Sequence, residues 1–426
     1  MIRKATIVFI LFLVFHSENK AQKVITEVNA SEIVVGKAVI AVTGVRIIDG
    51  NGGAPIENGS VVVANGKIVD VGQADRVKIP AGAEKVDGKG MSLLPGFIDA
   101  HFHIDGVDEL PGMFLQNGVT SIRDPGAWME TYENARKSGK PQPRMFLSGP
   151  HIDMFPPAYP NDAYVVRDAA EAVTQVNRAA DQGSTMIKAY FRLPPSIIKE
   201  VCIAAHKRGI PVSAHLETTE AMEAIEAGLD GIEHVTSFGL TMAPKREGEK
   251  FRQNVLADNN ARRNGRYEIW SQLDLKGKMA DSLVKFLVKK KTFVDPTLGA
   301  FEYREENGKL DTVKLQGFNN MKAFTGIMKK GGVHVVLGSH SMIKYAEKGW
   351  AYQREMELFA ESGLTNAQII VASTMENARF FRISDKLGSI EKGKIADLVL
   401  VKGNPLDNIS DARNVEKVML NGVWVK

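Results

Sequence analysis

The central part of the chain, from about residue 96 to residue 385, alternates between two patterns of apolar positions. Short apolar runs predict strands, and stretches with apolar residues three or four positions apart predict amphipathic helices. The predicted strands are 97–103, 119–124, 145–149, 186–191, 212–216, 231–235, 293–298 and 334–340, and the helices between them include 169–182, 196–208, 219–227, 280–290 and 318–330.

Eight strand–helix repeats indicate an α/β fold with a parallel sheet and right-handed crossovers, and eight strands close a (β/α)8 TIM barrel. An open, doubly wound sheet is the alternative. Against it, no glycine-rich phosphate-binding fingerprint follows the first predicted strand.

Both ends of the chain are instead rich in short Val/Ile runs separated by turn residues. Residues 33–95 contain such runs at 39–45, 59–63 and 67–71, and the last 40 or so residues contain the Asn421-Gly422 hairpin signal. We therefore expect a small composite β-sandwich domain built from both termini. The predicted boundaries are 23–95 and 386–426 for its two parts and 96–385 for the barrel.

Residues 1–22 have the pattern of a signal peptide. Arg3 and Lys4 precede the apolar run 5–15, and a polar segment follows up to Gln22, with cleavage expected near Ala21. Eleven residues are too few to span a membrane of about 30 Å as a helix. This predicts export to the periplasm or the medium; a buried N-terminal helix is the alternative.

The amino-acid composition narrows the class of protein further. Apolar residues make up 44% and charged residues 24% of the 426 residues, as in ordinary globular proteins. A net charge of +4 is too small at this length to indicate a nucleic-acid partner. No other segment is apolar enough to predict a membrane span, and the single cysteine, Cys202, excludes an intrachain disulfide and a multi-cysteine zinc site.

Polar residues occupy the carboxyl ends of several predicted barrel strands, where barrel enzymes carry their active sites. These residues are His101, His103, Lys188, His215, His234 and His340. Any one of them alone is readily explained as a hydrogen-bonded core residue. Together, several buried imidazoles and an ammonium group need partners, and a divalent metal ion supplies one.

These residues lie in segments that resemble the amidohydrolase superfamily, and most closely its imidazolonepropionase-like and Xaa-Pro or Xaa-Lys/Arg dipeptidase-like branch. The matching segments are Leu94-Pro95-Gly96-Phe97-Ile98-Asp99-Ala100-His101-Phe102-His103, residues 118–126, Ile187-Lys188, His215, Ile232-Glu233-His234 and the tail 388–399. The resemblance covers nearly the whole exported chain and implies a (β/α)8 barrel with a composite β-sandwich.

The resemblance also implies a metal centre with one or two divalent ions, zinc being the favoured metal. By this resemblance His101 and His103 bind the buried ion, and His215 and His234 bind the more exposed one. Lys188, carboxylated by CO₂ to a carbamate, bridges the two. The implied activity is cleavage of an amide or peptide bond in a small substrate, a dipeptide or an N-acyl amino acid, by a metal-activated hydroxide.

One position departs from the family pattern. The family has Gly-Thr-Asp at the eighth strand, whereas this chain has Gly338-Ser339-His340. Three interpretations stay open: His340 acts as a neutral ligand or general base; Asp295 supplies the lost carboxylate from the seventh strand; or the protein is an impaired relative that binds metal and captures a ligand without cleaving it.

A long basic insertion at 240–280 is the main candidate for substrate selection. It has nine basic and five acidic residues, and it predicts either a pocket wall that favours anionic substrates or a solvated charged surface. Tyr190 and Arg192, which follow Lys188 at alternate positions, are candidate substrate-binding residues. The sequence leaves open whether the protein forms a homo-oligomer.

Overall fold

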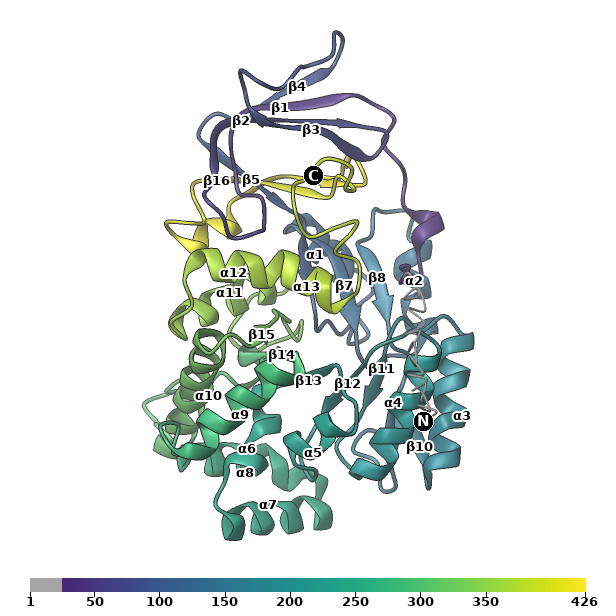
Figure 1. Ribbon diagram of the computed structural model, residues 1–426, viewed down its shortest axis with the longest axis vertical. Helices are drawn as coiled ribbons and strands as arrows, with labels where there is room; N and C mark the ends of the chain where they lie inside the picture. Colours follow the sequence, from purple (N-terminus) through teal and green to yellow (C-terminus); the bar gives the residue numbers. More distant parts are fainter. Residues whose placement is uncertain (1–24) are drawn as a thin grey trace, which may run out of the picture.

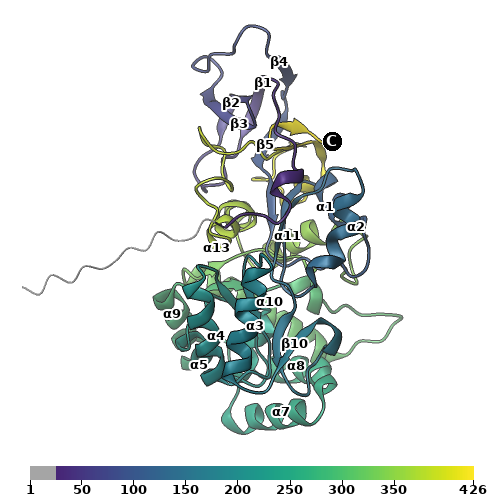
Figure 2. The ribbon, with the colours of Figure 1, turned by 90° about the vertical axis from the view of Figure 1, so that its right-hand side faces the viewer.

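The computed structural model describes residues 25–426, so the predicted signal peptide lies outside the described residues. The described chain forms an α/β barrel with a β-sheet unit at one end, and both views show the sheet unit and helix α7 at opposite ends of the molecule (Figures 1 and 2). No helix among residues 25–426 combines the length and the apolar character needed to cross a membrane.

The barrel strands run in parallel in two hydrogen-bonded sets. One set follows the order β6-β7-β8, and the other follows β10-β9-β11-β12-β13-β14-β15. Their bounds are β6 Phe97–Asp99, β7 Val119–Asp124, β8 Arg144–Leu147, β9 His151–Met154, β10 Ala163–Val166, β11 Ile187–Ala189, β12 Val212–His215, β13 Gly231–Glu233, β14 Phe293–Asp295 and β15 His334–Val335.

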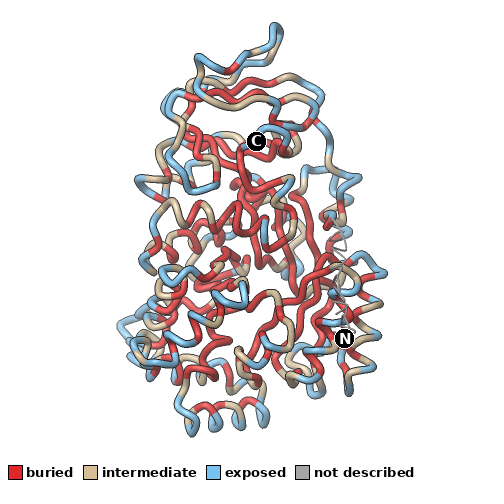
Figure 3. The backbone as a smooth tube through the Cα atoms, in the orientation of Figure 1, coloured by how far each residue is buried: buried red, intermediate tan, exposed pale blue. Residues whose placement is uncertain are grey.

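Backbone hydrogen bonds join the two sets on both sides. Thr185 N donates to Leu147 O (2.9 Å), which connects β8 to the start of β11, and Ala100 N donates to Leu337 O (3.0 Å), which connects the last strand to the first. These bonds close a ring of eight strands, β6, β7, β8, β11, β12, β13, β14 and β15, while β9 and β10 are two further parallel strands beside β11. The predicted (β/α)8 barrel is confirmed. The strands are buried on both faces: all residues of β7 and β12 are buried, as expected for a parallel sheet covered by helices (Figure 3).

Helices surround the barrel and bury one stripe each. In α3 the buried residues are Ala172, Val176, Ala179 and Ala180, which share one face, and the Asp168 carboxylate accepts from Glu171 N to cap the first turn. The helices are α1 Leu110–Gln116, α2 Glu133–Lys137, α3 Ala169–Asp181, α4 Pro195–Lys207, α5 Ala221–Glu226, α6 Gly239–Met242, α7 Lys245–Ala257, α8 Arg262–Ser271, α9 Lys278–Lys290, α10 Thr312–Lys330, α11 Ala351–Glu361, α12 Asn366–Val371 and α13 Asn377–Phe380.

The predicted insertion forms α6, α7 and α8 between β13 and α9. Helix α8 packs against α10 and α7, and Trp270 of α8 is fully buried against Phe324 of α10. The amphipathic character of the segment therefore anchors it to the barrel, while the polar face of α7 stays exposed.

Both chain ends contribute to one sheet, in the order β18-β17-β16-β5-β1-β2-β3, with β4 paired to β1. The strands are β1 Ile40–Ile47, β2 Ile56–Ala64, β3 Lys67–Gln73, β4 Glu84–Asp87, β5 Met91–Pro95, β16 Leu398–Lys402, β17 Val415–Leu420 and β18 Val423–Trp424. Strand β16 pairs antiparallel with β5, which joins the two termini and confirms the predicted composite β domain.

A buried ion pair fastens the sheet unit to the barrel. Arg144 at the start of β8 donates from Nε to Asp397 Oδ2 (2.7 Å) and from Nη2 to Asp397 Oδ1 (3.1 Å). Asp397, just before β16, also accepts from Asn421 N (2.7 Å). The two-point contact fixes the position of the C-terminal segment relative to the barrel.

Several strands end earlier than the sequence predicts. The first was expected to run to His103 but ends at Asp99, because the Asp99 carboxylate accepts from His101 N (3.0 Å) and from Ser339 N (2.9 Å) in place of a strand ladder. The last was expected to run to His340 but ends at Val335, and His340 adopts a left-handed backbone conformation (φ 57°). His101, His103 and His340 therefore lie on the loops that leave the strands.

Candidate active site

One cavity of about 700 Å³ collects the polar residues at the carboxyl ends of the strands. His101 and His103 reach it from the loop after β6, Lys188 from β11, His215 from the end of β12, His234 from just after β13 and His340 from the loop after β15. All six line the same cavity, so the structure brings together every metal-ligand candidate from the sequence.

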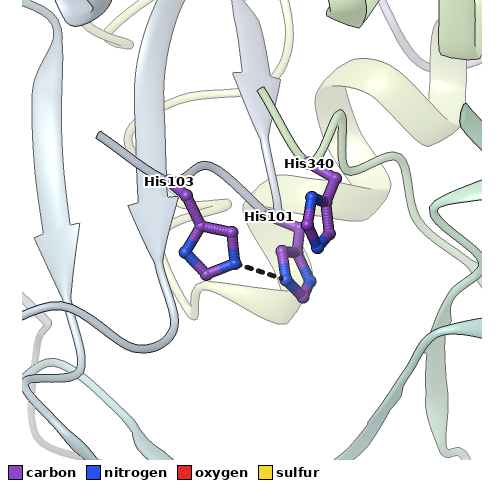
Figure 4. A group of neighbouring side chains, drawn as sticks. All are labelled: His101, His103 and His340. Carbon is purple, nitrogen blue, oxygen red and sulfur yellow. Dashed lines mark hydrogen bonds between the residues drawn. The ribbon is translucent and has the colours of Figure 1, made fainter. Parts of the chain in front are cut away.

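Three of the imidazoles form a compact group (Figure 4). His101 Nε2 and His103 Nε2 lie 3.2 Å apart, and the His340 ring stacks on the His101 ring with centroids 5.2 Å apart. Ligand atoms of the three residues lie within 4.8 Å of one another, close enough to hold one metal ion. The left-handed backbone at His340 allows this approach, since it turns the chain back toward His101.

The first two imidazoles each have a carboxylate behind them. His101 Nδ1 lies 2.9 Å from Glu233 Oε2 and 3.2 Å from Asp295 Oδ2, and His103 Nδ1 lies 3.2 Å from Asp124 Oδ1. With a proton on each Nδ1, both Nε2 atoms present lone pairs to the same point. In these tautomers the two lone pairs, 3.2 Å apart, repel each other unless a metal ion or a proton lies between them, so this donor set fits a metal ion.

The remaining two histidines are oriented in the same way. His234 Nδ1 lies 2.6 Å from Thr297 Oγ1, which leaves Nε2 for the cavity, and His215 Nε2 lies 2.8 Å from Glu217 Oε1, which leaves Nδ1. Burial lowers the pKa of His215 to about 4 and that of His234 well below its usual value. Both rings are therefore neutral near pH 7, the form that binds metal.

Lys188 is buried beside this cluster, with Nζ 3.9 Å from Glu233 Oε1. Burial lowers the pKa of Lys188 to about 8, although the nearby Glu233 charge opposes the shift. A neutral amine is the form that reacts with CO₂, so the environment of Lys188 favours the carbamate expected from the sequence. A carbamate there would face the histidines as an anionic ligand.

Glu233 carries the negative charge at the back of the site. Burial alone would raise its pKa, but Arg123, whose Nη2 lies 2.6 Å from Glu233 Oε1, holds that pKa well below its usual value. Burial and the Glu233 charge together raise the pKa of the adjacent Asp295 well above its usual value. Of the two carboxyl groups behind His101, Glu233 is therefore the one that holds the negative charge and Asp295 the one that takes up a proton more readily.

This position bears on the proposed role of Asp295 as a substitute carboxylate. Asp295 is fully buried, touches the Nδ1 side of His101, and is not among the residues that line the cavity. Gly338 permits its close approach, since a Cβ there would collide with the Asp295 carboxylate and with His101. Asp295 can therefore orient His101, or join His101 and Glu233 in a second metal-binding group, but it does not face substrate.

Of the two substrate-binding candidates, the structure brings only Tyr190 to the cavity. Tyr190 packs its ring against His151 (centroids 4.1 Å apart) and His215 (4.9 Å). Arg192 turns away: its Nε donates to Asn259 Oδ1 (3.0 Å) and its Nη2 to the carbonyls of Val255 and Leu256. We therefore correct the expectation for Arg192, which holds the end of α7.

Four functional residues were missed from the sequence. Asp124, Glu217 and Glu233 orient the histidines, as described above. The fourth is His151 at the start of β9, which is 4% exposed, lines the cavity and has no hydrogen-bond partner for Nε2 among the described residues. The position in the sequence could have indicated two of these residues, because Asp124 ends β7 and Glu233 ends β13.

The basic insertion supplies part of the cavity wall, and Arg266 Nη2 lies 3.1 Å from His215 Nε2. Arg262, Arg263 and Arg266 of α8 line the cavity, whereas Lys245, Arg246 and Lys250 of α7 are exposed and do not. Arg266 is neutralised by Glu217, whose Oε1 accepts from Arg266 Nε (2.6 Å). Helix α8 thus forms part of the cavity wall and the charges of α7 face solvent, while a preference for anionic substrates stays a prediction.

Comparison with protein families matches residues 92–425 to the model described as "Amidohydrolase family". Among curated proteins, the chain is 32% identical over 124 residues to N-acyl-D-aspartate deacylase of Alcaligenes xylosoxydans xylosoxydans, a stretch covering 28% of this chain and 24% of that protein. It is 33% identical over 127 residues to adenine deaminase of Listeria monocytogenes serotype 4b (strain F2365), covering 28% of this chain and 20% of the relative. The matches thus span about a quarter or less of these relatives.

Solved structures match over almost the whole chain. A Xaa-Pro dipeptidase with methionine in its active site superposes with a TM-score of 0.71 at 21% identity, covering 91% of this chain and 99% of that one. An ochratoxinase from A. niger gives a TM-score of 0.70 at 18% identity, covering 91% and 96%. At these identities the likeness establishes the fold.

Proposed function

Because the chain belongs to the amidohydrolase family, we propose that it is a metal-dependent hydrolase that cleaves the amide or peptide bond of a small substrate, a dipeptide or an N-acyl amino acid. One observation carries the proposal. Each of His101, His103, His215 and His234 has one ring nitrogen beside a carboxylate or hydroxyl oxygen, and the four residues line one cavity.

The proposed metal ligands are the residues of that cavity. His101 and His103 would hold one ion, His215 and His234 a second, and carboxylated Lys188 would bridge them, with zinc as the proposed metal. A bound divalent ion lowers the pKa of a coordinated water and polarises a carbonyl group. The protein's own contribution is to fix the tautomers, through Glu233 and Asp124, and to wall the cavity with Tyr190.

We propose that His340 takes the position of the missing aspartate as a neutral ligand or base. Its ring lies 5.0 Å from that of His103 and 5.6 Å from that of His234. Burial lowers the pKa of His340 to about 3, so the ring is neutral near pH 7 and has a lone pair to offer a metal or a proton.

Turnover measurements on the purified chain test this proposal. A library of dipeptides and N-acyl amino acids would be offered with and without added Zn²⁺, Mn²⁺ or Co²⁺, and metal-dependent cleavage of one member is the expected result. No cleavage with any metal, together with tight metal binding, would favour the alternative of a relative that captures a ligand.

Two substitutions at one position then separate the roles of His340. If His340→Ala and His340→Asp both abolish turnover while metal content stays the same, His340 acts in the reaction. If His340→Asp raises turnover, the histidine is an impaired version of the family aspartate. Met342, which is exposed on the same loop, offers the control variant Met342→Ala, expected to keep full activity.

We also propose that the protein is exported. The basic residues Arg3 and Lys4 and the apolar run 5–15 support this. Expression of the full-length gene followed by N-terminal sequencing of the protein from the periplasm or medium tests it. A mature N-terminus near residue 22 is expected, and retention of Met1 in the cytoplasm would contradict the proposal.

A further inference from the structure

Arg262 is a buried cation at the cavity wall without an anionic partner. Only 3% of the residue is exposed, and it lines the same cavity as the histidines. Its guanidinium donates to the carbonyl of Asn259 and to the Tyr159 hydroxyl (2.9 Å), and it lies over the rings of Tyr159 and Phe191 at 5.4 Å. Among residues 25–426 no carboxylate pairs with it, and Nε has no hydrogen-bond partner.

Burying an unpaired guanidinium is energetically unfavourable unless an anion pairs with it. Removing a guanidinium from water is energetically unfavourable, and neutral carbonyl or hydroxyl partners offset only part of that cost. The neighbouring Arg266 shows the contrast, because Glu217 neutralises it within the protein. The unmatched positive charge of Arg262 is therefore available to a ligand that carries a negative charge into the cavity.

A second arginine extends the same wall. Arg263 lines the cavity from the next position of α8, is exposed, and has no ion pair with a carboxylate in the described chain. Arg262 and Arg263 together give this wall two positive charges that no acidic side chain balances. A planar guanidinium fork suits a carboxylate, which can accept two parallel hydrogen bonds.

Acidic residues gather at another part of the cavity lining. Asp105, Asp124 and Asp162 line the cavity on the side of His103, and the charges of Asp124 and Asp162 contribute to a raised pKa of Asp105, after burial. A carboxylate of the substrate would be repelled there. Because these acidic residues cluster near His103, the two arginines of α8 are the more favourable place for an anionic group.

We infer that Arg262 and Arg263 form a subsite for a carboxylate of the substrate, so that the protein acts on amides whose amino-acid portion ends in a free carboxylate. This inference rests on the proposed function and specifies its substrate class. The subsite lies on the α7–α8 insertion. The Tyr190 ring lies 4.9 Å from the His215 ring and 6.2 Å from the Tyr159 ring, so these two tyrosines connect the subsite to His215.

Calorimetric binding of two matched probes tests the inference on the full-length purified protein. N-acetyl-L-phenylalanine carries a carboxylate, and N-acetyl-L-phenylalaninamide has the same shape without the charge. We expect the carboxylate to bind about tenfold more tightly or better, the size of a charge-assisted hydrogen-bonded pair. High salt should reduce the preference, because part of it is electrostatic.

Three variants locate the effect. Arg262→Gln and Arg263→Gln should each remove most of the preference for the carboxylate, and exposed Arg263 gives a variant whose folding is not at risk. Arg246→Gln removes the same charge from α7, where the side chain is exposed and does not line the cavity, and should bind like the parent protein. Thermal melts confirm that each variant is folded.

The outcomes separate this inference from the proposed function. Equal binding of both probes by the parent protein would overturn the subsite. A preference for the carboxylate that survives in Arg262→Gln and Arg263→Gln would also overturn it, and this is the result expected if the carboxylate binds only to a metal ion. Because binding is measured, an absence of turnover would remove the proposed function alone. Cleavage of amides without any carboxylate preference would remove the subsite alone.

Discussion

Glu217 connects the basic insertion to a proposed metal ligand. Its Oε1 lies 2.8 Å from His215 Nε2 and accepts from Arg266 Nε. Burial alone would raise the pKa of Glu217, but the Arg266 charge and His215 hold it below its usual value. The carboxylate therefore stays ionised and fixes the tautomer of His215 that leaves Nδ1 free.

We predict that Glu217→Gln weakens metal binding by about 10–100-fold, the usual effect of losing a carboxylate behind a metal-binding histidine. Competition with a fluorescent chelator would measure the affinity. Glu223→Gln on α5 is the matched control, because Glu223 is exposed and lies away from the cavity. Equal metal affinity in both variants would show that Glu217 does not orient His215.

Lys188 gives a pH dependence whose sign follows from its environment. Burial lowers its pKa from 10.5 to about 8, so the amine loses its proton earlier than an ordinary lysine. At fixed dissolved CO₂, the rate of carbamate formation in metal-free protein should rise about tenfold per pH unit below pH 8 and level off above it. ¹³C NMR with labelled CO₂ would follow the carbamate signal, and Lys188→Arg should show none. A rate that still climbs beyond pH 9 would contradict the lowered pKa.

At the scale of elements, Arg192 fastens the basic insertion to the barrel. Its guanidinium reaches the last carbonyls of α7, those of Val255 and Leu256, and the side chain of Asn259. A cation at the carboxyl end of a helix satisfies free carbonyls and opposes the helix dipole. The position of α8 therefore depends on a residue of the loop after β11.

We predict that Arg192→Gln loosens α7 and α8 with little loss of global stability. Limited proteolysis should cut within 245–271 at least several-fold faster than in the parent protein, while the melting temperature shifts by only a few degrees. Arg208→Gln, which breaks a surface pair with Asp181, is the control and should leave the cleavage pattern unchanged. Unchanged cleavage in Arg192→Gln would show that α8 is held by its packing on α10 alone.

The elements and the gathering of the histidines could be predicted because both follow from local pattern and from the geometry of parallel strands. The length of the strands could not, since Asp99 and Ser339 replace ladder hydrogen bonds by side-chain bonds across 240 residues of sequence. Arg192 was misplaced, and the position of His151 at the cavity was missed, for a related reason. Their neighbours belong to the insertion and to the loop that contains Tyr159, and no local sequence pattern encodes where these segments lie in the fold.

At the scale of the whole molecule, the Arg144–Asp397 pair controls how firmly the two structural units hold together. Both side chains are nearly fully buried, and the charge of Asp397 raises the pKa of Arg144 despite its burial. Asp397 also accepts from the backbone of Asn421, so one carboxylate organises three segments.

We predict that Asp397→Asn lowers the free energy of unfolding by about 3–5 kcal/mol, because it leaves a buried guanidinium with one charged partner, Glu27. Urea denaturation followed by circular dichroism would measure the change. Lys402→Gln breaks an exposed pair with Glu416 and should cost less than about 1 kcal/mol. Similar decreases in the free energy of unfolding in the two variants would show that the buried pair stabilises the protein no more than the exposed pair does.

The pairing of β5 with β16 has a consequence for biosynthesis. Strand β5 ends at Pro95, and its partner begins at Leu398, so the ribosome must add the entire barrel before that edge can be covered. Throughout this interval Leu93 and Leu94 belong to an incomplete sheet with an open edge, the kind of surface that chaperones shield and that nascent chains use to aggregate. Truncating the final strands should therefore impair the yield of folded protein more than the loss of so short a tail would indicate.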